Sequence, residues 1–318
     1  MPKINIFCQA SFKKGLGHLI RQIHIANELR ARNADVFFYI PKFQTAEDII
    51  KDHNFSFSIV ENFDSGFSEI TEPTDVTLLD IQDTTATLIK NLRKQSKKII
   101  SFEDQGDGRN HVDLLIDCNL HPEDSKSIPT QILYGLPYSV LAPEFEKLHS
   151  KERHFEGQIQ SLLITFGGTD PHNITLDLTK HIPNETKATI IAGPGFNSFQ
   201  KLKELDSNRF CVVQNIQDMA SMLASFDAVF CSGGVTLHEA MCVGTPAFVI
   251  SQVPHQEDKA KAAEKSGAAI NLGQAHSWNK DRLPEIFQLE KKDLLAMSTA
   301  GKNQIDGKGL QRIIEFIL

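Results

Sequence analysis

Short apolar runs alternate with amphipathic stretches along almost the whole chain. In the first half, apolar runs typical of buried strands occupy residues 4–8, 36–40, 76–80, 98–102 and 112–116. Helical spacing of apolar residues is found between them, at residues 19–32, 45–52 and 84–95. Strands that alternate with helices in this way predict an α/β protein with parallel sheets.

The alternation stops at residues 143–160, where charged residues are crowded and no strand pattern is found. It restarts at 161–166, and further strands are predicted at 188–192, 210–213, 228–231 and 247–251, with a helix at 236–243. We therefore expect a linker at 143–160 and two doubly wound domains, residues 1–145 and 158–308, that face a cleft. The apolar helical segment 309–318 is a candidate to cross back onto the first domain.

Composition narrows the class of protein. The chain has 318 residues, more than one core usually holds, and 41% hydrophobic with 23% charged residues is ordinary for a globular protein. A net charge of −7 argues against a general nucleic-acid surface. The chain has no apolar run long enough for a membrane span, no signal-peptide pattern, and five cysteines without a CxxC pair. These features indicate a cytoplasmic protein with reduced thiols.

A glycine turn follows the first predicted strand and opens the next helix, with the sequence Lys14-Gly15-Leu16-Gly17-His18. Gly15 and Gly17 let backbone N–H groups approach a ligand, and the helix N-terminus favours negative charge. Because imidazole titrates near working pH, His18 is a candidate general base. Arg21, one helical turn later, either meets a phosphate or pairs with a carboxylate such as Glu28.

Acidic residues follow two of the strands predicted in the first half. Asp80 ends the strand at 76–80, and Glu103 and Asp104 directly follow the strand at 98–102. Because ligands bind beyond the carboxyl ends of parallel strands, we expect these acids on the cleft side, where they can orient the imidazole of His18 or bind sugar hydroxyls. The other histidines show no ligand spacing, so no metal site is predicted.

Two Gly-Gly turns directly follow strands in the second half. They are Gly167-Gly168-Thr169-Asp170 and Ser232-Gly233-Gly234-Val235-Thr236. The N–H groups of such turns can form a nest around phosphate, although a single glycine turn is also explained by its tight geometry alone. Neither GxxxxGK[ST] nor GxGxxG is present, which argues against a Walker ATPase and an ordinary dinucleotide-binding fold.

Polar residues flank these turns. Glu239 follows the second turn by about one helical turn. A carboxylate there either accepts both hydroxyls of a ribose or is simply stabilised by the helix dipole near the N-terminus. Thr236 either caps that helix or donates to a phosphate oxygen. His255 and Gln256 start a further helix, and Gln256 is placed either to donate to sugar hydroxyls or to form a polar helix start.

Taken together, these sequences resemble those of nucleotide-sugar enzymes with the GT-B fold. The most similar are the spore-coat polysaccharide glycosyltransferase-like proteins and the UDP-2,4-diacetamido-2,4,6-trideoxy-altropyranose hydrolases of pseudaminic acid synthesis. The resemblance spans nearly the whole chain. Besides the turns above, it rests on Tyr134-Gly135-Leu136-Pro137-Tyr138, Pro143-Glu144-Phe145, Phe166 to Pro171, and Asp306-Gly307-Lys308-Gly309.

The resemblance implies two Rossmann-like domains and a division of labour between them. The second domain, which also looks like that of the UDP-N-acetylglucosamine transferase of peptidoglycan synthesis, would bind UDP with the ribose on Glu239. The phosphates would lie at Gly168, Thr169, Gly233 and Gly234. His18 would take the proton from an acceptor hydroxyl or from water. Such enzymes stabilise the leaving diphosphate with helix dipoles and backbone donors, so neither a metal nor a cofactor is expected.

One departure from the resemblance bears on the reaction. The hydrolases carry Asp-His-Tyr after the third strand of the first domain, where this chain has Asp80-Ile81-Gln82. This favours the spore-coat-type group. We expect an inverting transferase that moves a UDP-linked amino or deoxy sugar to a sugar or lipid-linked acceptor, for a surface polysaccharide or glycan. The alternatives are a hydrolase that releases UDP and free sugar, with water as acceptor, and an inactive nucleotide-sugar-binding subunit.

Overall fold

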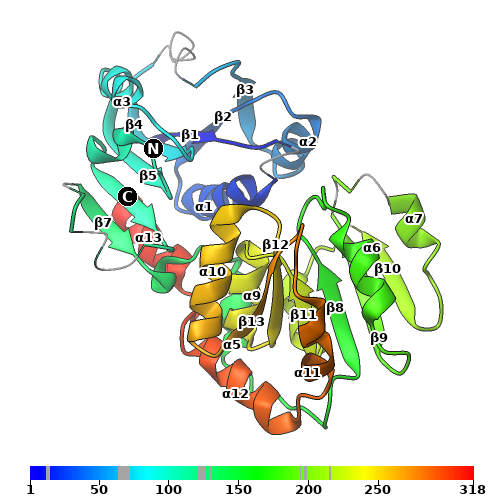
Figure 1. Cartoon of the computed structure of the whole chain (residues 1–318). Coiled ribbons are helices and arrows are strands. Elements are labelled where there is room, and N and C mark those ends of the chain that lie inside the picture. The colour runs from blue at the N-terminus through cyan, green and yellow to red at the C-terminus, as the bar shows by residue number, and fades with distance from the viewer. Residues whose placement is uncertain are drawn as a thin grey trace. The chain divides into compact units, whose positions relative to one another are not determined.

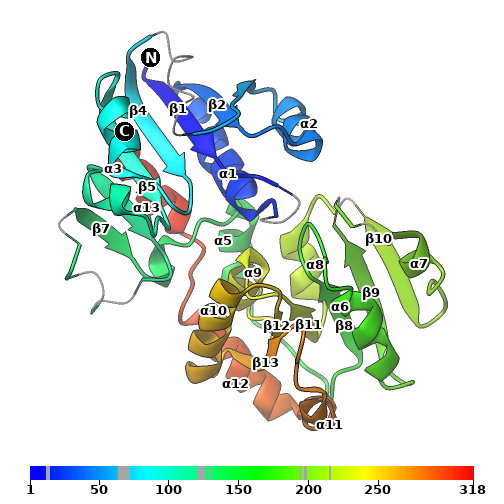
Figure 2. The same ribbon diagram turned by 45° about the horizontal axis from the view of Figure 1, so that its top comes forward.

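The computed structural model describes residues 1–11, 15–63, 72–120, 123, 126–128, 130–193, 195–196, 199–214 and 216–318. The chain divides into two compact units. Unit 1 comprises Met1–Leu141 and Lys308–Leu318, and unit 2 comprises Ala142–Gly307. Figures 1 and 2 show that each unit is a layer of strands flanked by helices.

Unit 1 is built on a seven-stranded parallel sheet with the order β3-β2-β1-β4-β5-β6-β7. Its strands are β1 (Lys3–Cys8), β2 (Asp35–Ile40), β3 (Ser56–Ile59), β4 (Thr74–Asp80), β5 (Ser96–Phe102), β6 (Leu114–Asp117) and β7 (Gln131–Tyr134). In register, Ile6 of β1 pairs with Phe38 on one side and Leu78 on the other. The chain order reverses between β1 and β4, and open α/β sheets bind ligands at such a switch point.

Helices cover the sheet of unit 1. They are α1 (Gly17–Ala31), α2 (Gln44–Asp52), α3 (Ala86–Leu92) and α13 (Gly309–Ile317), with 3₁₀ turns η2 (Asp107–Asn110) and η3 (Leu136–Tyr138). α13 comes from the end of the chain and packs against α1 and η3. Its first residue approaches the backbone closely, because a Cβ on Gly309 would lie 2.1 Å from the carbonyl oxygen of Ser139.

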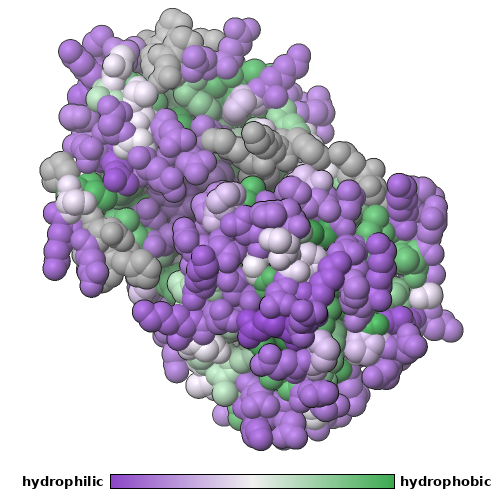
Figure 3. All heavy atoms as spheres, in the orientation of Figure 1, coloured by the Kyte–Doolittle hydropathy of each residue, from purple (hydrophilic) through white to green (hydrophobic). Residues whose placement is uncertain are grey.

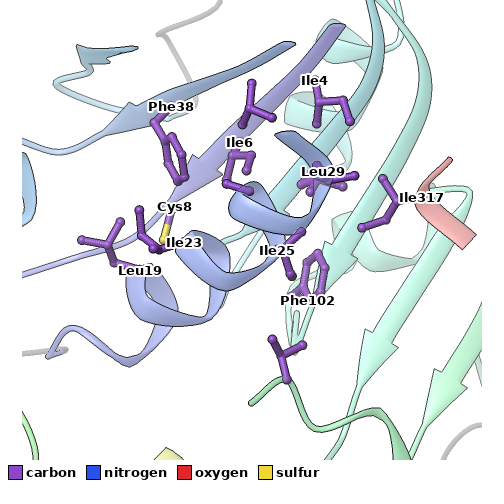
Figure 4. Packing of buried hydrophobic residues seen from close by; sticks show 14 of the residues in the cluster. Ile4, Ile6, Cys8, Leu19, Ile23, Ile25, Leu29, Phe38, Phe102 and Ile317 are labelled. Atoms are coloured by element: carbon purple, nitrogen blue, oxygen red, sulfur yellow. The ribbon is translucent and has the colours of Figure 1, made fainter. Parts of the chain in front are cut away.

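The main core of unit 1 lies between the sheet, α1 and α13. Figure 4 shows its side chains, which come from β1, β2 and β5 as well as from the two helices. Ile6, Leu19 and Phe38 are fully buried in it, and Ile317 of α13 adds to it. The apolar spacing that predicted the helix at 19–32 is therefore the face by which α1 packs on the sheet.

Unit 2 is built on a six-stranded parallel sheet with the order β10-β9-β8-β11-β12-β13. Its strands are β8 (Ser161–Thr165), β9 (Lys187–Ala192), β10 (Phe210–Gln214), β11 (Ala228–Cys231), β12 (Ala247–Ser251) and β13 (Ala269–Gln274). The order reverses between β8 and β11, so this sheet has its own switch point. Both predicted Gly-Gly turns follow these two strands.

The helices of unit 2 alternate with its strands. They are α5 (Pro143–His149), α6 (Ile174–Leu178), α7 (Phe199–Lys203), α8 (Met219–Ser225), α9 (Val235–Val243), α10 (Pro254–Lys265), α11 (Leu283–Phe287) and α12 (Lys291–Lys302). Two 3₁₀ turns, η4 (Thr179–His181) and η5 (Lys280–Arg282), precede a strand and a helix respectively. The core of this unit includes Leu162, Ile164, Phe230 and Phe248.

The structure corrects the prediction of a linker at 143–160. Its first half is the helix α5, which packs on α8 and α9 within unit 2. Phe145 is buried there, and the ring nitrogen Nδ1 of His149 lies 2.9 Å from the carbonyl oxygen of Cys242. The boundary between the units falls after Leu141, so the whole of α5 belongs to unit 2.

The surface in view is polar. In Figure 3, hydrophobic side chains are scattered among hydrophilic ones over the described residues. None of the described helices combines the length and the apolar character that crossing a bilayer requires. Of the five cysteines, four are buried and Cys211 is exposed.

Candidate functional site

The turn after β1 is described from Gly15 onward, and Lys14 lies outside the described residues. The amide of Gly15 donates to the carbonyl oxygen of Ser11 at 2.8 Å. Gly15 has a φ of +80°, a backbone conformation that residues with a side chain rarely adopt. α1 then begins at Gly17, so His18 stands in the first turn of that helix.

Asp80 is the centre of a buried polar cluster at the end of β4. Its side chain is 0% exposed. Atom Oδ1 lies 2.6 Å from Nδ1 of His18 and accepts from Nη2 of Arg21 at 2.7 Å. Atom Oδ2 accepts from Nε of Arg21 and from Nε2 of Gln22, each at 2.9 Å. The structure thus brings together His18 and Asp80, and all three partners of Asp80 come from one face of α1.

Arg21 bridges two carboxylates. Its Nη1 lies 2.6 Å from Oε1 of Glu103, while its other nitrogens bind Asp80. Its guanidinium carbon lies 5.7 Å from the ring centroid of Phe102. The alternative partner considered from the sequence, Glu28, pairs instead with Arg32 at 3.0 Å. Arg21 therefore pairs with Asp80 and Glu103, and Glu28 pairs with another arginine.

The charges of the cluster stabilise one another. Burial alone would raise the pKa of Asp80, but the charges of Arg21 and His18 and their hydrogen bonds outweigh it and lower this pKa to about 2. Burial would likewise lower the pKa of Arg21, but the two carboxylates raise it well above its ordinary value. Asp80 is therefore ionised at any working pH, and it can orient the imidazole of His18.

Glu103 is placed by an unusual backbone conformation. It follows β5 with a φ of +48°, which is uncommon for a residue with a side chain, and such residues are concentrated at functional sites. The thiol of Cys118, after β6, donates to its Oε1 at 3.0 Å. The side chains of His18 and Glu103 are 20% and 17% exposed. These two groups, unlike Asp80, can meet a substrate.

Asp104 lies apart from this cluster. It is buried, and its carboxylate accepts from the amide of Thr84 at 3.1 Å, from the hydroxyl of Thr84, and from the amide of Gly106 at 2.9 Å. Burial raises its pKa despite these hydrogen bonds. In the structure, Asp104 ties the segment after β4 to the segment after β5.

The first Gly-Gly turn of unit 2 follows β8. Gly167 has a φ of +83°, so this position favours glycine. The neighbouring turn after β9 approaches closely, because a Cβ on Gly193 would lie 2.2 Å from the carbonyl oxygen of Gly167. Sequence reasoning did not single out Gly193, although its position after a strand is the same signal that identified the other turns.

The side chain of Asp170 and the backbone amides of this turn differ in their hydrogen bonding. Asp170 is buried, and its two oxygens accept from the amides of Ile174 at 3.0 Å and Thr175 at 2.8 Å. Its carboxylate thus satisfies the first N–H groups of α6. The amides of Gly168 and Thr169 donate no hydrogen bond within the described part of the chain.

The second turn, Ser232 to Thr236, leads into α9. Gly234 precedes the helix, which has no side-chain cap at its N-terminus. A Cβ on Gly233 would lie 2.3 Å from the carbonyl oxygen of Gln256, so this turn touches the start of α10. The first N–H groups of a helix have no partner within it, and together with the helix dipole they favour an anion.

Glu239 lies one turn into α9 and is partly buried. Burial raises its pKa to about 7, although a hydrogen bond from Thr236 acts in the opposite direction. Thr236 thus has a partner within its own helix. A raised pKa on a carboxyl placed beside a glycine turn is typical of a functional position.

Gln256 and Gln252 hold the loops of unit 2 together. Oε1 of Gln256 accepts from the amide of Gln252 at 2.9 Å, and its Nε2 lies near Gly234. Gln252 in turn donates to the carbonyl oxygens of Phe166 and Thr169. His255, next to Gln256, is exposed. Sequence reasoning missed Gln252, because a glutamine beside a strand end carries no pattern that distinguishes it.

Among the described residues, no three His, Cys, Asp or Glu side chains are grouped so that they could hold a metal ion. The candidate site therefore has two parts, each within one unit. Unit 1 offers the ionic cluster of His18, Arg21, Asp80 and Glu103. Unit 2 offers two glycine turns, an uncapped helix end and Glu239.

Two doubly wound parallel units on one chain define the GT-B fold, and the chain has this fold. Solved structures of glycosyltransferases match it over its whole length. MurG of Acinetobacter baumannii has a TM-score of 0.67 at 13% identity, covering 100% of this chain and 99% of that protein. UGT89C1 of Arabidopsis thaliana, solved with UDP-L-rhamnose, has a TM-score of 0.63 at 14% identity, with coverage of 100% and 99%.

In sequence, the chain is related to the spore coat polysaccharide biosynthesis protein SpsG of Bacillus subtilis. The two are 24% identical over 333 aligned positions, which cover 98% of this chain and 96% of SpsG. No protein-family model matches the chain.

Proposed function

We propose that this protein is a glycosyltransferase that moves a sugar from a nucleoside diphosphate, UDP in our reading, to an acceptor hydroxyl with inversion at the anomeric carbon. The observation that carries the proposal is the 2.6 Å contact between Nδ1 of His18 and the buried, ionised Asp80. A histidine oriented by a carboxylate at a sheet switch point is the arrangement of a general base. The GT-B fold and the relation to SpsG support a role in polysaccharide synthesis.

The proposed base acts through one ring nitrogen. With Nδ1 held against Asp80, Nε2 of His18 takes the proton of the acceptor hydroxyl. The hydroxyl oxygen forms a bond to the anomeric carbon of the sugar, and the bond from that carbon to the diphosphate oxygen breaks. The electron pair of that bond leaves with UDP. Because the acceptor attacks the face opposite to the leaving group, the configuration is inverted.

The donor is proposed to bind at unit 2. The turns at Gly167 and Gly233 and the N-terminus of α9 would take the diphosphate, and Glu239 would accept the ribose hydroxyls. Backbone N–H groups and a helix dipole stabilise the charge that develops on a leaving diphosphate. The uncapped N-terminus of α9 supports this assignment, and we propose that the reaction needs no metal or other cofactor.

The acceptor is proposed to be a sugar or lipid-linked hydroxyl rather than water. After Asp80, where the resembling hydrolases carry two ring residues, this chain has Ile81 and Gln82. Ile81 is 3% exposed and packs in an apolar cluster with Leu79 and Leu88, so it presents no polar group to a water molecule. The inert-subunit alternative rests on the same loss of ring residues, and the contact of His18 with Asp80 favours an active enzyme over it.

An assay without acceptor separates transfer from hydrolysis. Purified protein and UDP-sugars are incubated alone, and release of UDP and of free sugar is followed. We expect slow release that a suitable acceptor accelerates. Rapid release of both products without any acceptor would replace the transferase by a hydrolase.

Substitution of the base tests the site. We expect His18→Ala to lower turnover by about 10²–10⁴-fold, the range typical of a general base, and to leave UDP affinity unchanged. His24→Ala, six residues further along the same helix, is the matched control and should retain turnover. Equal turnover in wild type and His18→Ala would reject His18 as the base.

A further inference from the structure

Gln252, directly after β12, clamps the first Gly-Gly turn of unit 2 at both ends. Its Nε2 donates to the carbonyl oxygen of Phe166 at 2.9 Å and to that of Thr169 at 3.2 Å. Between these two carbonyls lies the Gly167-Gly168 pair. On the other side of the turn, the amide of Gly195 donates to the carbonyl oxygen of Gly168 at 2.9 Å.

These contacts set the direction of the N–H groups of the turn. In a trans peptide, the carbonyl oxygen and the N–H of the next residue point in opposite directions. The carbonyl of Gly168 is held by Gly195, so the N–H of Thr169 points away from that contact. The carbonyl of Thr169 is held by Gln252, so the N–H of Asp170 points away from it. A clamp on the carbonyls therefore orients the N–H groups that an anion would use.

Gln252 also connects this turn to the second one. Its own amide donates to Oε1 of Gln256 at 2.9 Å, and the backbone of Gln256 is the group that Gly233 closely approaches. One chain of contacts thus runs from the turn after β8 to the turn before α9. Both turns belong to unit 2 and follow the two strands at its switch point.

The orientation of the Gln252 amide is fixed by its surroundings. Two carbonyl oxygens face Nε2, so rotating the amide would place Oε1 against them. Oε1 itself is buried and has no hydrogen-bond partner among the described residues. An unsatisfied buried acceptor is destabilising, and the two hydrogen bonds that Nε2 donates to the turn oppose this effect.

We propose that Gln252 is a positioning residue for the diphosphate of the donor. It holds the turn from Gly167 to Asp170 in the shape that directs backbone N–H groups at phosphate, and it keeps that turn in place relative to the N-terminus of α9. The inference rests on the donor site proposed for unit 2. It assigns a role to a side chain that neither contacts the ligand nor takes part in the chemistry.

The test compares two ligands, UDP and uridine, and two side chains that each donate to a pair of carbonyl oxygens, Gln252 and Arg209. Gln252→Met keeps the size of the side chain and removes both bonds. We expect it to weaken UDP binding by about tenfold, because a turn that is no longer held in one shape must lose conformational freedom when phosphate binds. Binding of uridine, which lacks phosphates, should change by less than twofold. Calorimetry with both ligands gives these values, and the midpoint of thermal unfolding is measured in parallel.

Arg209→Met is the matched control. Arg209 also donates to two carbonyl oxygens, those of Ile182 and Pro183, but it directly precedes β10, an edge strand that does not neighbour β12. It should lower the unfolding midpoint and leave the ratio of UDP to uridine affinity unchanged. If Gln252→Met does not fold, Gln252→Asn, whose shorter amide cannot reach both carbonyls, replaces it.

The possible outcomes are distinguishable. If the Gln252 variants lose UDP and uridine affinity equally, or lose neither, the positioning role is wrong while the proposed donor site stands. If wild-type protein binds no UDP, the proposed donor site fails and the positioning role with it. A selective loss of UDP affinity, absent in Arg209→Met, supports the inference.

Discussion

Asp80 in unit 1 and Glu239 in unit 2 are both carboxylates beside a glycine turn, yet they lie in opposite electrostatic environments. Burial raises the pKa of each. At Asp80 the charges of Arg21 and His18 outweigh burial, and the pKa falls to about 2. At Glu239 the opposing contribution is a hydrogen bond from Thr236, and the pKa rises to about 7.

The difference shows that the two units differ in the source of their charge. The cluster of unit 1 is ionic: Arg21 bridges the carboxylates of Asp80 and Glu103, and Asp80 also contacts His18. The turns of unit 2 offer backbone N–H groups and a helix end, so the charge there would come with the ligand. Unit 1 should therefore be sensitive to changes of side-chain charge, and unit 2 to changes of backbone shape.

The largest expected effect comes from breaking the ionic cluster. Asp80→Asn leaves Arg21 with one carboxylate in a buried place, and removing one partner of a buried pair costs about 3–5 kcal/mol. We expect the free energy of unfolding to fall by that amount, with turnover lost as well. In wild type, the smaller part of this stability that depends on the ionisation of Asp80 is complete above the ordinary pKa of aspartate and is lost as the pH falls through about 2.

Denaturant titration measures this effect, and Asp75→Asn provides the control. Asp75 lies on the same strand, and its exposed pair with Lys97 at 2.7 Å should contribute little to stability, because water and salt screen it. If Asp80→Asn destabilises the protein no more than Asp75→Asn does, the ion pairs of Asp80 do not stabilise the fold as we expect.

A smaller effect is expected from adding one methyl group to the backbone of unit 2. In Gly233→Ala the new Cβ would lie 2.3 Å from the carbonyl oxygen of Gln256, so the start of α10 must move. Such crowding costs about 1–3 kcal/mol, and we expect UDP affinity to fall with it. Calorimetry and thermal unfolding check both.

Gly157→Ala is the control for this change, because nothing lies within 4 Å of its Cβ position. It should leave both stability and UDP affinity near those of wild type. If Gly233→Ala binds UDP as tightly as Gly157→Ala does, the contact between the turn and α10 plays no part in donor binding.

Much of the fold could be predicted from the pattern of apolar residues. The strands at 228–231 and 247–251 were predicted with the bounds of β11 and β12, because buried parallel strands are continuous apolar runs. β3, β7 and β13 were missed. All three are edge strands that mix apolar and polar residues, and their pairing with a neighbour, not their composition, makes them strands.

The grouping of the candidate residues was predictable where it depends on residue type and not where it depends on packing. His18, Asp80 and Glu103 were identified because charged residues at strand ends and in a glycine turn are unusual. The bridging role of Arg21 was left open, since a helix sequence cannot show which carboxylate folds back onto it. Asp104 and Gln252 act through backbone groups that are distant in sequence, and no local pattern records such contacts.

The smallest expected effect is the pH dependence that Glu239 gives to donor binding. An ionised carboxylate accepts hydrogen bonds from both ribose hydroxyls, whereas its protonated form gives up one acceptor position. One hydrogen bond is worth about 0.5–1.5 kcal/mol, so UDP affinity should rise by about twofold to tenfold as the pH passes from below to above 7. For the protein without ligand, the free energy of unfolding changes in the opposite direction and falls as the pH rises. A carboxyl with a raised pKa contributes stability below its ordinary pKa, and this contribution is lost as the pH rises through about 7.

Glu239→Gln isolates this effect, because the terminal phosphate of UDP also titrates, with a pKa near 6. The readout is therefore the difference between wild type and Glu239→Gln in the slope of UDP affinity against pH, measured by calorimetry from pH 6 to 8. A 2′-deoxy analogue of UDP, with one hydroxyl fewer, should shrink that difference. If both proteins show the same slope with UDP, Glu239 does not bind the ribose. The contrast between the two units would then rest on the ionic cluster and the glycine turns alone.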